Sequence, residues 1–257
     1  MSLKLSTPEH TVADIVKFIR ETFAAQNKKY AIIAVSGGID SALSLALLAQ
    51  ALPKDQIITV FLPYSTQSTE DAETIVNFLN IPLQNQHKMN IAPIVDAAAK
   101  LLPITKENHH RKGNLMARSR MMLVFDTAKR LDGLVCGTEN KSEHFLGYYT
   151  RFGDAASDIE PLANLYKTNV REVAEYLAFP AQFLEKSPSA GLWQGQTDEK
   201  EMGFSYEVAD QVLYQLVDER KEPEQIFVRD ISKEMIASVV KQVKNNRFKF
   251  HVPYVMK

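Results

Sequence analysis

The stretch YAIIAVSGGIDSAL, residues 30–43, decides the fold of this chain. Its first half is apolar and β-branched, as in a buried strand, and its second half resumes after the glycines with residues typical of a helix. Gly37 and Gly38 allow the backbone to turn sharply and to approach a ligand closely. Ser36, Ser41 and the first N–H groups of the helix then face any anion bound at the turn. The stretch therefore predicts a strand, a phosphate-binding turn and a helix.

Asp40 places a carboxylate inside this predicted anion site. A carboxylate repels a phosphate unless a cation lies between them, so the pattern indicates phosphate bound together with Mg²⁺, for which Asp40 supplies an oxygen ligand. A strand, two glycines and a helix also occur as a plain tight turn, but the flanking Ser36, Asp40 and Ser41 favour the nucleotide site. The sequence has neither the Gly-Lys-Ser/Thr of a Walker A loop nor the third spaced glycine of the dinucleotide fingerprint.

The composition is that of a globular α/β protein. The chain has 257 residues, of which 45% are hydrophobic, and a formal net charge of −1, so we expect residues 1–257 to form one domain. The near-neutral charge argues against a nucleic-acid partner bound by a broad basic face. No apolar run is long enough to span a bilayer, and residues 1–12 lack the apolar core of a signal peptide. A single cysteine excludes an internal disulfide, which fits a cytoplasmic location.

Strands and helices alternate along the first half of the chain. Short apolar or β-branched runs predict strands at residues 30–35, 57–62, 81–86 and 134–136. Helical spacing predicts helices at residues 11–26, 40–52, 69–79, 91–101 and 114–131, the first of them capped by Thr11. This alternation predicts a doubly wound parallel sheet that binds its ligand at the carboxyl ends of the strands, where Ser36 falls.

The second half of the chain contains two long connections and a helical extension. Residues 144–167 and 186–203 have no clear periodicity, and connections of that length are typical of lids and binding loops. Residues 204–244 return to helical spacing and predict an α-helical extension packed on the sheet. Residues 115–125 are apolar on most faces of their helix, which predicts a surface for a homodimer.

Other polar residues lie where they can serve a nucleotide site. Arg118 is a cation on an otherwise apolar helix face, a position that suits an anion site, a salt bridge within a dimer or an exposed arginine equally well. After the strand at residues 134–136, Thr138 offers a hydroxyl and Glu143 a carboxylate, as a nucleotide contact and a second Mg²⁺ ligand require. Taken singly, the two residues are more typical of a helix cap and a solvated acid.

The motifs together resemble those of the ammonia-dependent NAD synthetases. Ser-Gly-Gly-x-Asp-Ser is similar to the pyrophosphate-binding loop of the N-type ATP pyrophosphatases, and later motifs occur in the order and spacing of that one family over nearly the whole chain. These later motifs are Lys112-Gly113-Asn114, Ala117-Arg118-x-Arg120-Met121, Gly137-Thr138 to Glu143, Gly147-Tyr148-Tyr149-Thr150-Arg151-Phe152-Gly153-Asp154, Asp158-Ile159-x-Pro161-Leu162, Lys167-Thr168, Ser187-Pro188-Ser189-Ala190-Gly191-Leu192 and Gln196-Thr197-Asp198-Glu199.

The resemblance implies an ATP-dependent acid–ammonia ligase with a Rossmann-like sheet of the adenine-nucleotide α-hydrolase type and a C-terminal helical extension. Such an enzyme amidates deamido-NAD to NAD, the last step of NAD biosynthesis. The carboxylate of deamido-NAD attacks the α-phosphate of ATP, pyrophosphate leaves, and ammonia displaces AMP from the NAD-adenylate. The expected partners are therefore deamido-NAD, ATP and ammonia, with Mg²⁺ as cofactor.

The resemblance also assigns roles to residues of this chain. The residues expected to bind ATP are Val35, Ser36, Gly37, Gly38, Ile39, Asp40, Ser41, Thr138, Lys167 and Ser189, of which Ser36, Asp40 and Lys167 are expected to be catalytic. Asp40 and Glu143 are expected to bind Mg²⁺. The residues expected to bind deamido-NAD are Arg118, Arg151, Asp158, Phe248 and Lys249, near a dimer interface.

The chain departs from relatives at a few of these positions. Arg151 stands where many have lysine and Ser189 where many have threonine, so charge and hydroxyl are kept. Phe61-Leu62 lacks an arginine that some relatives use for ATP, and Phe248 replaces a histidine in the tail. Cys136 lies in an apolar strand, where a small buried hydrophobe is expected, and we expect no glutaminase domain.

Two other classes of protein share part of this pattern. An acid–amine ligase with a different acid keeps the Ser36 loop and the metal carboxylates but does not need Arg118, Arg151 or Asp158. A non-catalytic adenine-nucleotide module keeps the fold but has no use for the predicted metal ligands. The later motifs favour the synthetase over both.

Overall fold

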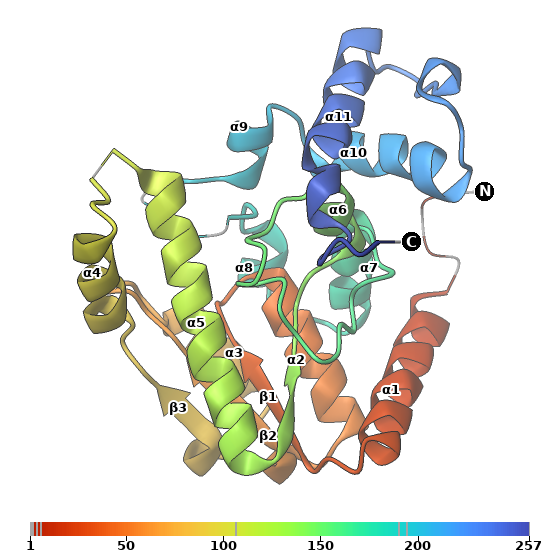
Figure 1. The fold of residues 1–257 in the computed structure, drawn as a ribbon. Coiled ribbons are helices and arrows are strands. Elements are labelled where there is room, and N and C mark those ends of the chain that lie inside the picture. Colours follow the sequence, from red (N-terminus) through yellow and green to blue (C-terminus); the bar gives the residue numbers. More distant parts are fainter. Residues whose placement is uncertain are drawn as a thin grey trace.

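A parallel sheet of four strands forms the centre of the N-terminal part of the molecule (Figure 1). The structure is a computed structural model, and it describes residues 3, 5, 7–105, 107–189, 191–193 and 195–256. The strands, in the order β3-β2-β1-β4, are β1 (Tyr30–Ala34), β2 (Ile57–Phe61), β3 (Gln86–Lys88) and β4 (Gly133–Cys136). Ile32 of β1 lies opposite Ile58 on one side and Val135 on the other. The β-branched residues of the central strand are therefore buried between two neighbours.

Helices cover both faces of the sheet, as in a doubly wound fold. Helices α1 (Pro8–Ala25), α2 (Ile39–Ala51), α3 (Glu70–Phe78) and α7 (Lys167–Tyr176) share one apolar core with Ile33. Helices α4 (Ala92–Leu101) and α5 (His109–Leu131) share the other core with Ile32. Successive residues of β1 thus face opposite cores, because side chains alternate along a strand.

A group of helices beyond the sheet forms a third core. Its main elements are α6 (Lys141–Leu146), α10 (Tyr206–Leu213), the π-helical turn η3 (Tyr214–Asp218) and α11 (Lys233–Asn246). In Figure 1, α10 and α11 stand above the sheet, with α6 between them and the strands. The smaller elements are α8 (Ala181–Glu185), α9 (Asp198–Met202) and the 3-10 turns η1 (Lys54–Gln56), η2 (Leu83–Asn85), η4 (Pro223–Gln225) and η5 (Arg247–Lys249). The predicted helical extension is present, but it packs on α6 and α7 rather than on the sheet as expected.

The structure confirms the fold class but corrects several boundaries. The third strand is Gln86–Lys88, whereas residues 83–85 form a 3-10 turn after Pro82, so the strand predicted at residues 81–86 was misplaced. The first helix begins at Pro8 with Thr7 at its N-cap, because proline suits the first turn of a helix, so Thr11 does not cap it. The long helix begins at His109 rather than at residue 114.

Gly113 explains the missed start of α5. Glycine disfavours helix interiors, so the sequence predicted a start after it. A Cβ atom at Gly113 would lie 2.7 Å from Leu192 Cδ1, which belongs to the long connection after α8. Glycine therefore allows close packing between the helix and this connection, and this packing outweighs its low helix propensity.

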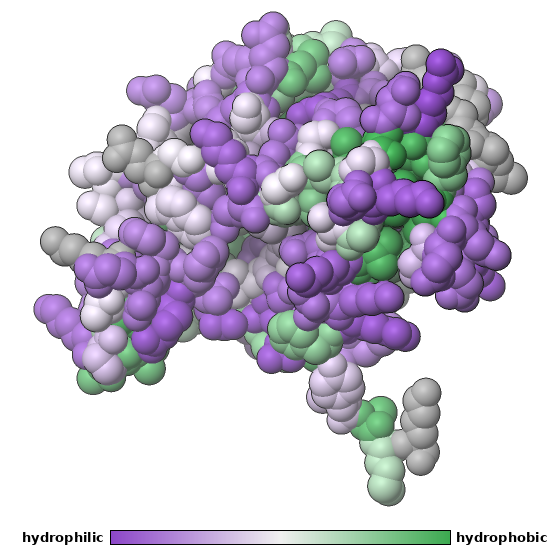
Figure 2. All heavy atoms as spheres, turned by 90° about the horizontal axis from the view of Figure 1, so that it is seen from above, coloured by the Kyte–Doolittle hydropathy of each residue, from purple (hydrophilic) through white to green (hydrophobic). Residues whose placement is uncertain are grey.

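One face of the molecule is mainly polar. Figure 2 shows a mostly hydrophilic face with a group of apolar side chains on one side and a short segment that projects from the body. Tyr254, Val255 and Met256 near the C-terminus are exposed. Within the described residues, no helix combines the length and apolar character needed to cross a bilayer.

We predict that the protein is a homodimer that uses the outer face of α5. Met122 on this helix is 48% exposed, and its burial in an interface would remove apolar surface from water. Light scattering at micromolar concentration should give the mass of a dimer, and Met122→Glu should shift the mass toward that of a monomer. Leu83→Glu, which changes another exposed apolar residue on η2, is the control and should leave the dimer intact. A monomer mass for the unaltered protein would contradict the prediction.

Candidate active site

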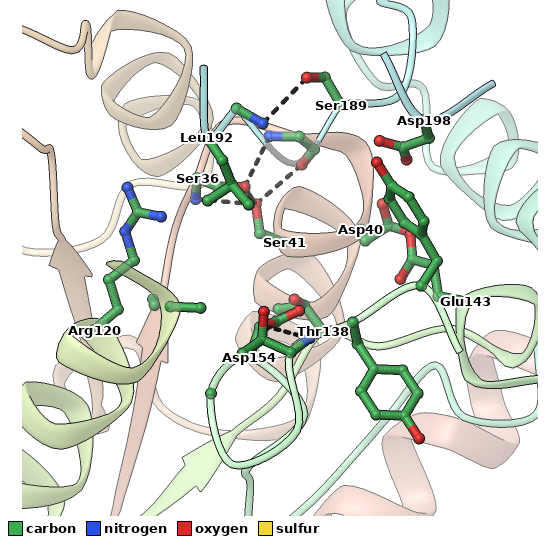
Figure 3. Close-up of a pocket in the computed structure, with 18 of the residues that line it drawn as sticks. Ser36, Asp40, Ser41, Arg120, Thr138, Glu143, Asp154, Ser189, Leu192 and Asp198 are labelled. Atoms are coloured by element: carbon green, nitrogen blue, oxygen red, sulfur yellow. Dashed lines mark hydrogen bonds between the residues drawn. The ribbon is translucent and has the colours of Figure 1, made fainter. Parts of the chain in front are cut away.

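A cavity of about 870 Å³ opens beside the carboxyl ends of the strands, as expected for a parallel α/β sheet. Figure 3 shows side chains from several separate segments pointing into it. Among the ten residues predicted to bind ATP, all except Gly37 line this cavity, as does Glu143. Residues that are distant in the sequence are therefore brought together at the site.

The turn between β1 and α2 is held by its own serines. Gly38 N donates to Ser36 Oγ at 3.2 Å, Ser36 N donates to Ser41 Oγ at 3.2 Å, and Ser41 Oγ donates to Gly38 O at 3.0 Å. Gly37 has φ of +80°, and a Cβ atom there would lie 2.7 Å from Asp71 Cβ, so the turn requires glycine. No side chain caps the start of α2, which leaves the N–H groups of its first turn available to an anion.

Lys167 lies between two carboxylates at the floor of the site. Its Nζ is 2.5 Å from Asp40 Oδ2 and 3.0 Å from Glu143 Oε1, and the lysine side chain is only 2% exposed. Asn140 Nδ2 donates to Asp40 Oδ1 at 2.8 Å, and the Asn140 side chain also caps α6, which carries Glu143. The starts of α2, α6 and α7 thus meet at one ammonium group.

Burial and the neighbouring charges shift the pKa values of this cluster. Burial acts to lower the pKa of Lys167, but Asp40 and Glu143 outweigh it and hold that pKa above its usual value. Burial raises the pKa of Glu143 to about 8, opposed by Lys167 and assisted by Asp40 and Asp198. Burial also raises the pKa of Asp198, which lines the same cavity. With Glu143 mostly protonated at neutral pH, Asp40 and Lys167 balance each other, and a cation bound beside them would displace the proton of Glu143.

The connection between α8 and α9 covers one side of the cavity. Lys186 Nζ is 2.5 Å from Asp71 Oδ2 on α3, and Gln67 Nε2 donates to Gly191 O at 2.7 Å. The ring of Trp193 lies 5.2 Å from that of His110 at the start of α5. Residues 190 and 194 of this connection lie outside the described residues. The described parts contact α3, α5 and the loop that contains Gln67, and they have no regular structure before α9.

Four of the five residues predicted to bind deamido-NAD lie outside the cavity lining. Lys249 lines it and donates from Nζ to Tyr149 O at 3.0 Å. Arg118 donates from Nε and Nη2 to Arg151 O, at 3.3 Å in both cases. The Arg151 guanidinium lies 5.4 Å from the ring of Phe248, so the exposed Arg118 and Phe248 and the half-buried Arg151 form a group next to the cavity. Asp158 Oδ2 accepts from Val135 N at 2.7 Å and thereby stabilises the end of β4.

Arg120 lines the cavity although the sequence analysis assigned it no role. Its Nε donates to Leu62 O and its Nη2 to Gln67 Oε1, both at 3.0 Å, so both acceptors are neutral. Burial lowers its pKa, and the charge of Asp154 opposes this.

Arg118 and Arg120 are separated by about 200° around a helix. The helical phase was the signal, because Arg120 shares the face of the buried Met116 and Val124.

Asp154 is a second residue that the sequence analysis quoted without a role. It lines the cavity, accepts from Thr150 N at 2.9 Å, and has its pKa raised by burial. Figure 3 places Asp154 below Thr138 and across the cavity from Ser189. A local sequence signal for this position was absent, since Gly-Asp pairs are ordinary in turns.

The fold and the phosphate-binding turn define an α/β nucleotide-binding protein, and comparison with known proteins defines its family. A profile of the NAD synthase family matches residues 11–253. The NH(3)-dependent NAD(+) synthetase of Fusobacterium nucleatum is 38% identical over 247 residues, covering 95% of this chain and 94% of the relative. That of Pyrococcus furiosus is 42% identical over 248 residues, covering 95% and 93%. The chain belongs to the NAD synthase family.

Solved structures agree with this assignment. The NMN synthetase of Francisella tularensis superposes with a TM-score of 0.83 at 31% identity, over 98% of this chain and 99% of that one. The NH3-dependent NAD synthetase of Campylobacter jejuni superposes with a TM-score of 0.81 at 28% identity, over 98% and 100%. The family and the ligase class expected from the sequence are thus confirmed.

We predict that the described part of the connection around Trp193 changes its exposure when substrates bind. Trp193 is the only tryptophan of the chain, so its fluorescence reports on this segment alone. Saturation with ATP and deamido-NAD should reduce quenching by acrylamide, because closure over the cavity would exclude solvent. The chain unfolded in guanidinium gives the upper limit of quenching. A spectrum and a quenching constant that both stay unchanged would contradict closure.

Proposed function

We propose that this chain is an ammonia-dependent NAD synthetase that amidates deamido-NAD at the expense of ATP. The observation that carries the proposal is the buried contact of Lys167 with Asp40 and Glu143 beside a free helix N-terminus. That arrangement combines an anion site, a cation and two hard oxygen ligands, which are the groups needed to cleave ATP between its α- and β-phosphates. The products would be NAD, AMP and pyrophosphate.

The turn at residues 36–41 would hold the phosphates of ATP. Its serine hydroxyls and the N–H groups of the first turn of α2 provide donors at fixed positions, so little reorganisation is needed when charge develops. Lys167 is fully charged at neutral pH, and it lines the same cavity as this turn. We infer that its ammonium stabilises the negative charge that develops on the phosphates as pyrophosphate departs. Thr138 and Ser189 would contact the rest of the nucleotide.

Asp40 and Glu143 fit the requirements of a magnesium site that is completed by the substrate. Mg²⁺ is usually bound by one or two protein carboxylates together with phosphate oxygens, at about 2.1 Å. Both carboxylates contact the same ammonium, so they converge on one small volume. Within the described residues, no group of three or more His, Cys, Asp and Glu side chains forms a complete metal site. Mg²⁺ held there with ATP would neutralise phosphate charge.

Two steps would follow from this arrangement. The carboxylate of deamido-NAD attacks the α-phosphate of ATP and displaces pyrophosphate, which converts a poor leaving group into AMP. Ammonia then attacks the acyl carbon of the NAD-adenylate, the C–O bond to AMP breaks, and one proton is lost to give the amide. The connection around Ser189 and Leu192 would protect the adenylate from water.

Free ammonia is the nitrogen source that we propose for this chain. Cys136 is 3% exposed in β4, and burial raises the pKa of its thiol, so it is unsuited to act as the nucleophile of a glutaminase. We propose that residues 1–257 act as one synthetase domain. We also propose that the enzyme is cytoplasmic, where reduced thiols and its substrates are found.

The group of Arg118, Arg151 and Phe248 would bind deamido-NAD together with Asp158 and Lys249. An aromatic ring next to a guanidinium offers a stacking surface for a base and a charge for a phosphate. This group lies outside the cavity lining, so the bound dinucleotide would extend from the cavity to the surface, where a second subunit could cover it. We add Arg120 to the proposed site, since it lines the cavity on the side across from Asp40 and Glu143 (Figure 3).

A mononucleotide product is the second candidate, favoured by the likeness to the Francisella protein named NMN synthetase. One assay tests both. The purified chain is incubated with ATP, Mg²⁺ and ammonium, with either deamido-NAD or nicotinate mononucleotide as the acid. We expect NAD, AMP and pyrophosphate in equal amounts with the first acid. A faster reaction with the mononucleotide would favour the second candidate, and no reaction with either acid would refute both.

We predict that Asp40→Asn and Glu143→Gln each lower kcat by roughly 100-fold or more, because an amide is a weak ligand for Mg²⁺ and a preorganised charge is lost. Thermal unfolding checks that each variant is folded. Glu73→Gln, which removes a surface carboxylate paired with Lys88, is the control and should retain activity. Turnover near the rate of the unaltered enzyme would exclude that residue as a metal ligand.

We predict that the rate at a fixed total ammonium concentration rises with pH toward the pKa of ammonium, since only neutral ammonia has a free lone pair. Rates measured at several pH values should fall on one curve when they are plotted against free ammonia. Glutamine should support no synthesis by a preparation free of glutaminase. Synthesis from glutamine would show that the chain has its own means of releasing ammonia.

A further inference from the structure

A buried carboxylate on α10 contacts the starts of two helices that carry site residues. Asp210 is 0% exposed. Its Oδ2 accepts from Thr168 N at 2.9 Å, and its Oδ1 accepts a short hydrogen bond from Ser142 Oγ. Ser142 Oγ in turn accepts from Lys167 N at 2.8 Å. One carboxylate therefore contacts the residue next to Glu143 on α6 and the residue next to Lys167 on α7.

Packing alone does not account for a carboxylate at this position. Burial raises the pKa of Asp210 to about 6, so the group is charged at neutral pH in a dry environment. No lysine or arginine among the described residues forms an ion pair with it. Its compensation comes from the unpaired N–H groups at the start of α7 and from the helix dipole. An apolar residue would avoid the free-energy cost of burying a charge. The hydrogen bonds that Asp210 accepts from Ser142 and Thr168 therefore account for a carboxylate here.

We propose that Asp210 is a positioning residue that fixes Lys167 and Glu143 relative to each other and thereby places the ammonium for its role with ATP. The proposal rests on the function proposed above for Lys167 and Glu143. Asp210 touches neither the cavity nor the ammonium itself. It acts through Ser142 and through the backbone of α7, which determine the direction from which the Lys167 side chain reaches Asp40 and Glu143.

Neighbouring residues on the same helical face make similar contacts. Tyr206, one turn before Asp210, has its ring 5.2 Å from Lys167 Nζ. Asp218, which ends the π-helical turn after α10, accepts from Lys141 Nζ at 2.6 Å and from Tyr166 OH at 2.7 Å. These two donors directly precede Ser142 and Lys167 in the sequence. The face of α10 and η3 therefore holds both helix starts at several points, and Asp210 is the buried centre of this contact.

The kinetic test compares Asp210→Asn with Ser142→Ala. Ser142→Ala removes the hydroxyl between Asp210 and Lys167 N, and Asp210→Asn removes the charge to which this hydroxyl donates, while no side chain of the cavity lining is altered. We expect kcat to fall by roughly 10- to 100-fold for both variants, as for a small displacement of a catalytic group, with KM for ammonium unchanged. The double variant should have about the same kcat as the less active of the two single variants, because both changes act on the same chain of hydrogen bonds.

Glu207→Gln is the matched control. Glu207 lies on α10 and also contacts α7, through an ion pair with Arg171 at the surface. A general loosening between α10 and α7 would lower kcat in this variant too, whereas the proposal expects it to match the unaltered enzyme. Losses of equal size in Glu207→Gln and Asp210→Asn would overturn the proposal. Folded Asp210→Asn and Ser142→Ala variants with full kcat would overturn it as well.

A crystal structure of Ser142→Ala separates this proposal from the proposed function. Ser142→Ala keeps the bond from Thr168 N to Asp210, so it is the milder change where Asp210→Asn fails to fold. We expect Lys167 Nζ to lose contact with at least one of Asp40 and Glu143 in the variant. An ammonium that still contacts both would overturn the positioning role. This comparison stands even where the unaltered enzyme makes no NAD.

Discussion

The site depends on one buried contact, in which the ammonium of Lys167 lies between the carboxylates of Asp40 and Glu143. The three residues begin or lie near the beginning of three different helices, so the contact requires β1, β4 and the connection after β4 to be in register. A charge buried in this way is costly if one partner is missing, which makes the arrangement cooperative. Burial raises the pKa of Glu143 in this contact, so a cation that arrives with ATP would take the place of its proton.

Different elements around this contact provide different parts of the site. The sheet and α2 provide a rigid phosphate-binding turn, with backbone N–H groups that need no side-chain cap. The C-terminal helices provide buried polar groups that hold the starts of α6 and α7, while the connection around Trp193 contacts the opposite wall. Helix starts therefore carry the charges, and the connection without regular structure lines the same cavity.

Several features of the site could be predicted from sequence because they depend on local chemistry. The Ser36 to Ser41 turn, the alternation of strands and helices and the later motifs were sufficient for the fold class and the family. The strand predicted at residues 81–86 was wrong because Pro82 and a 3-10 turn displace it. The start of α5 was missed because the packing of Gly113 on Leu192 is not visible in the sequence. Arg120 was given no role because its place in the cavity lining depends on the phase of α5 relative to the cavity.

The sequence by itself determined which chemical groups are present and which of them lie at the ends of strands, since residue type and hydrophobic period are local properties. It placed Asp40 and Lys167 in one site only through a family resemblance, because they are separated by 127 positions. Tertiary structure alone decided that Lys167 is buried against both carboxylates, that Arg118 points away from the cavity lining, and that Asp210 holds two helix starts. Those properties depend on long-range packing and on the exclusion of water, which no local stretch of sequence specifies.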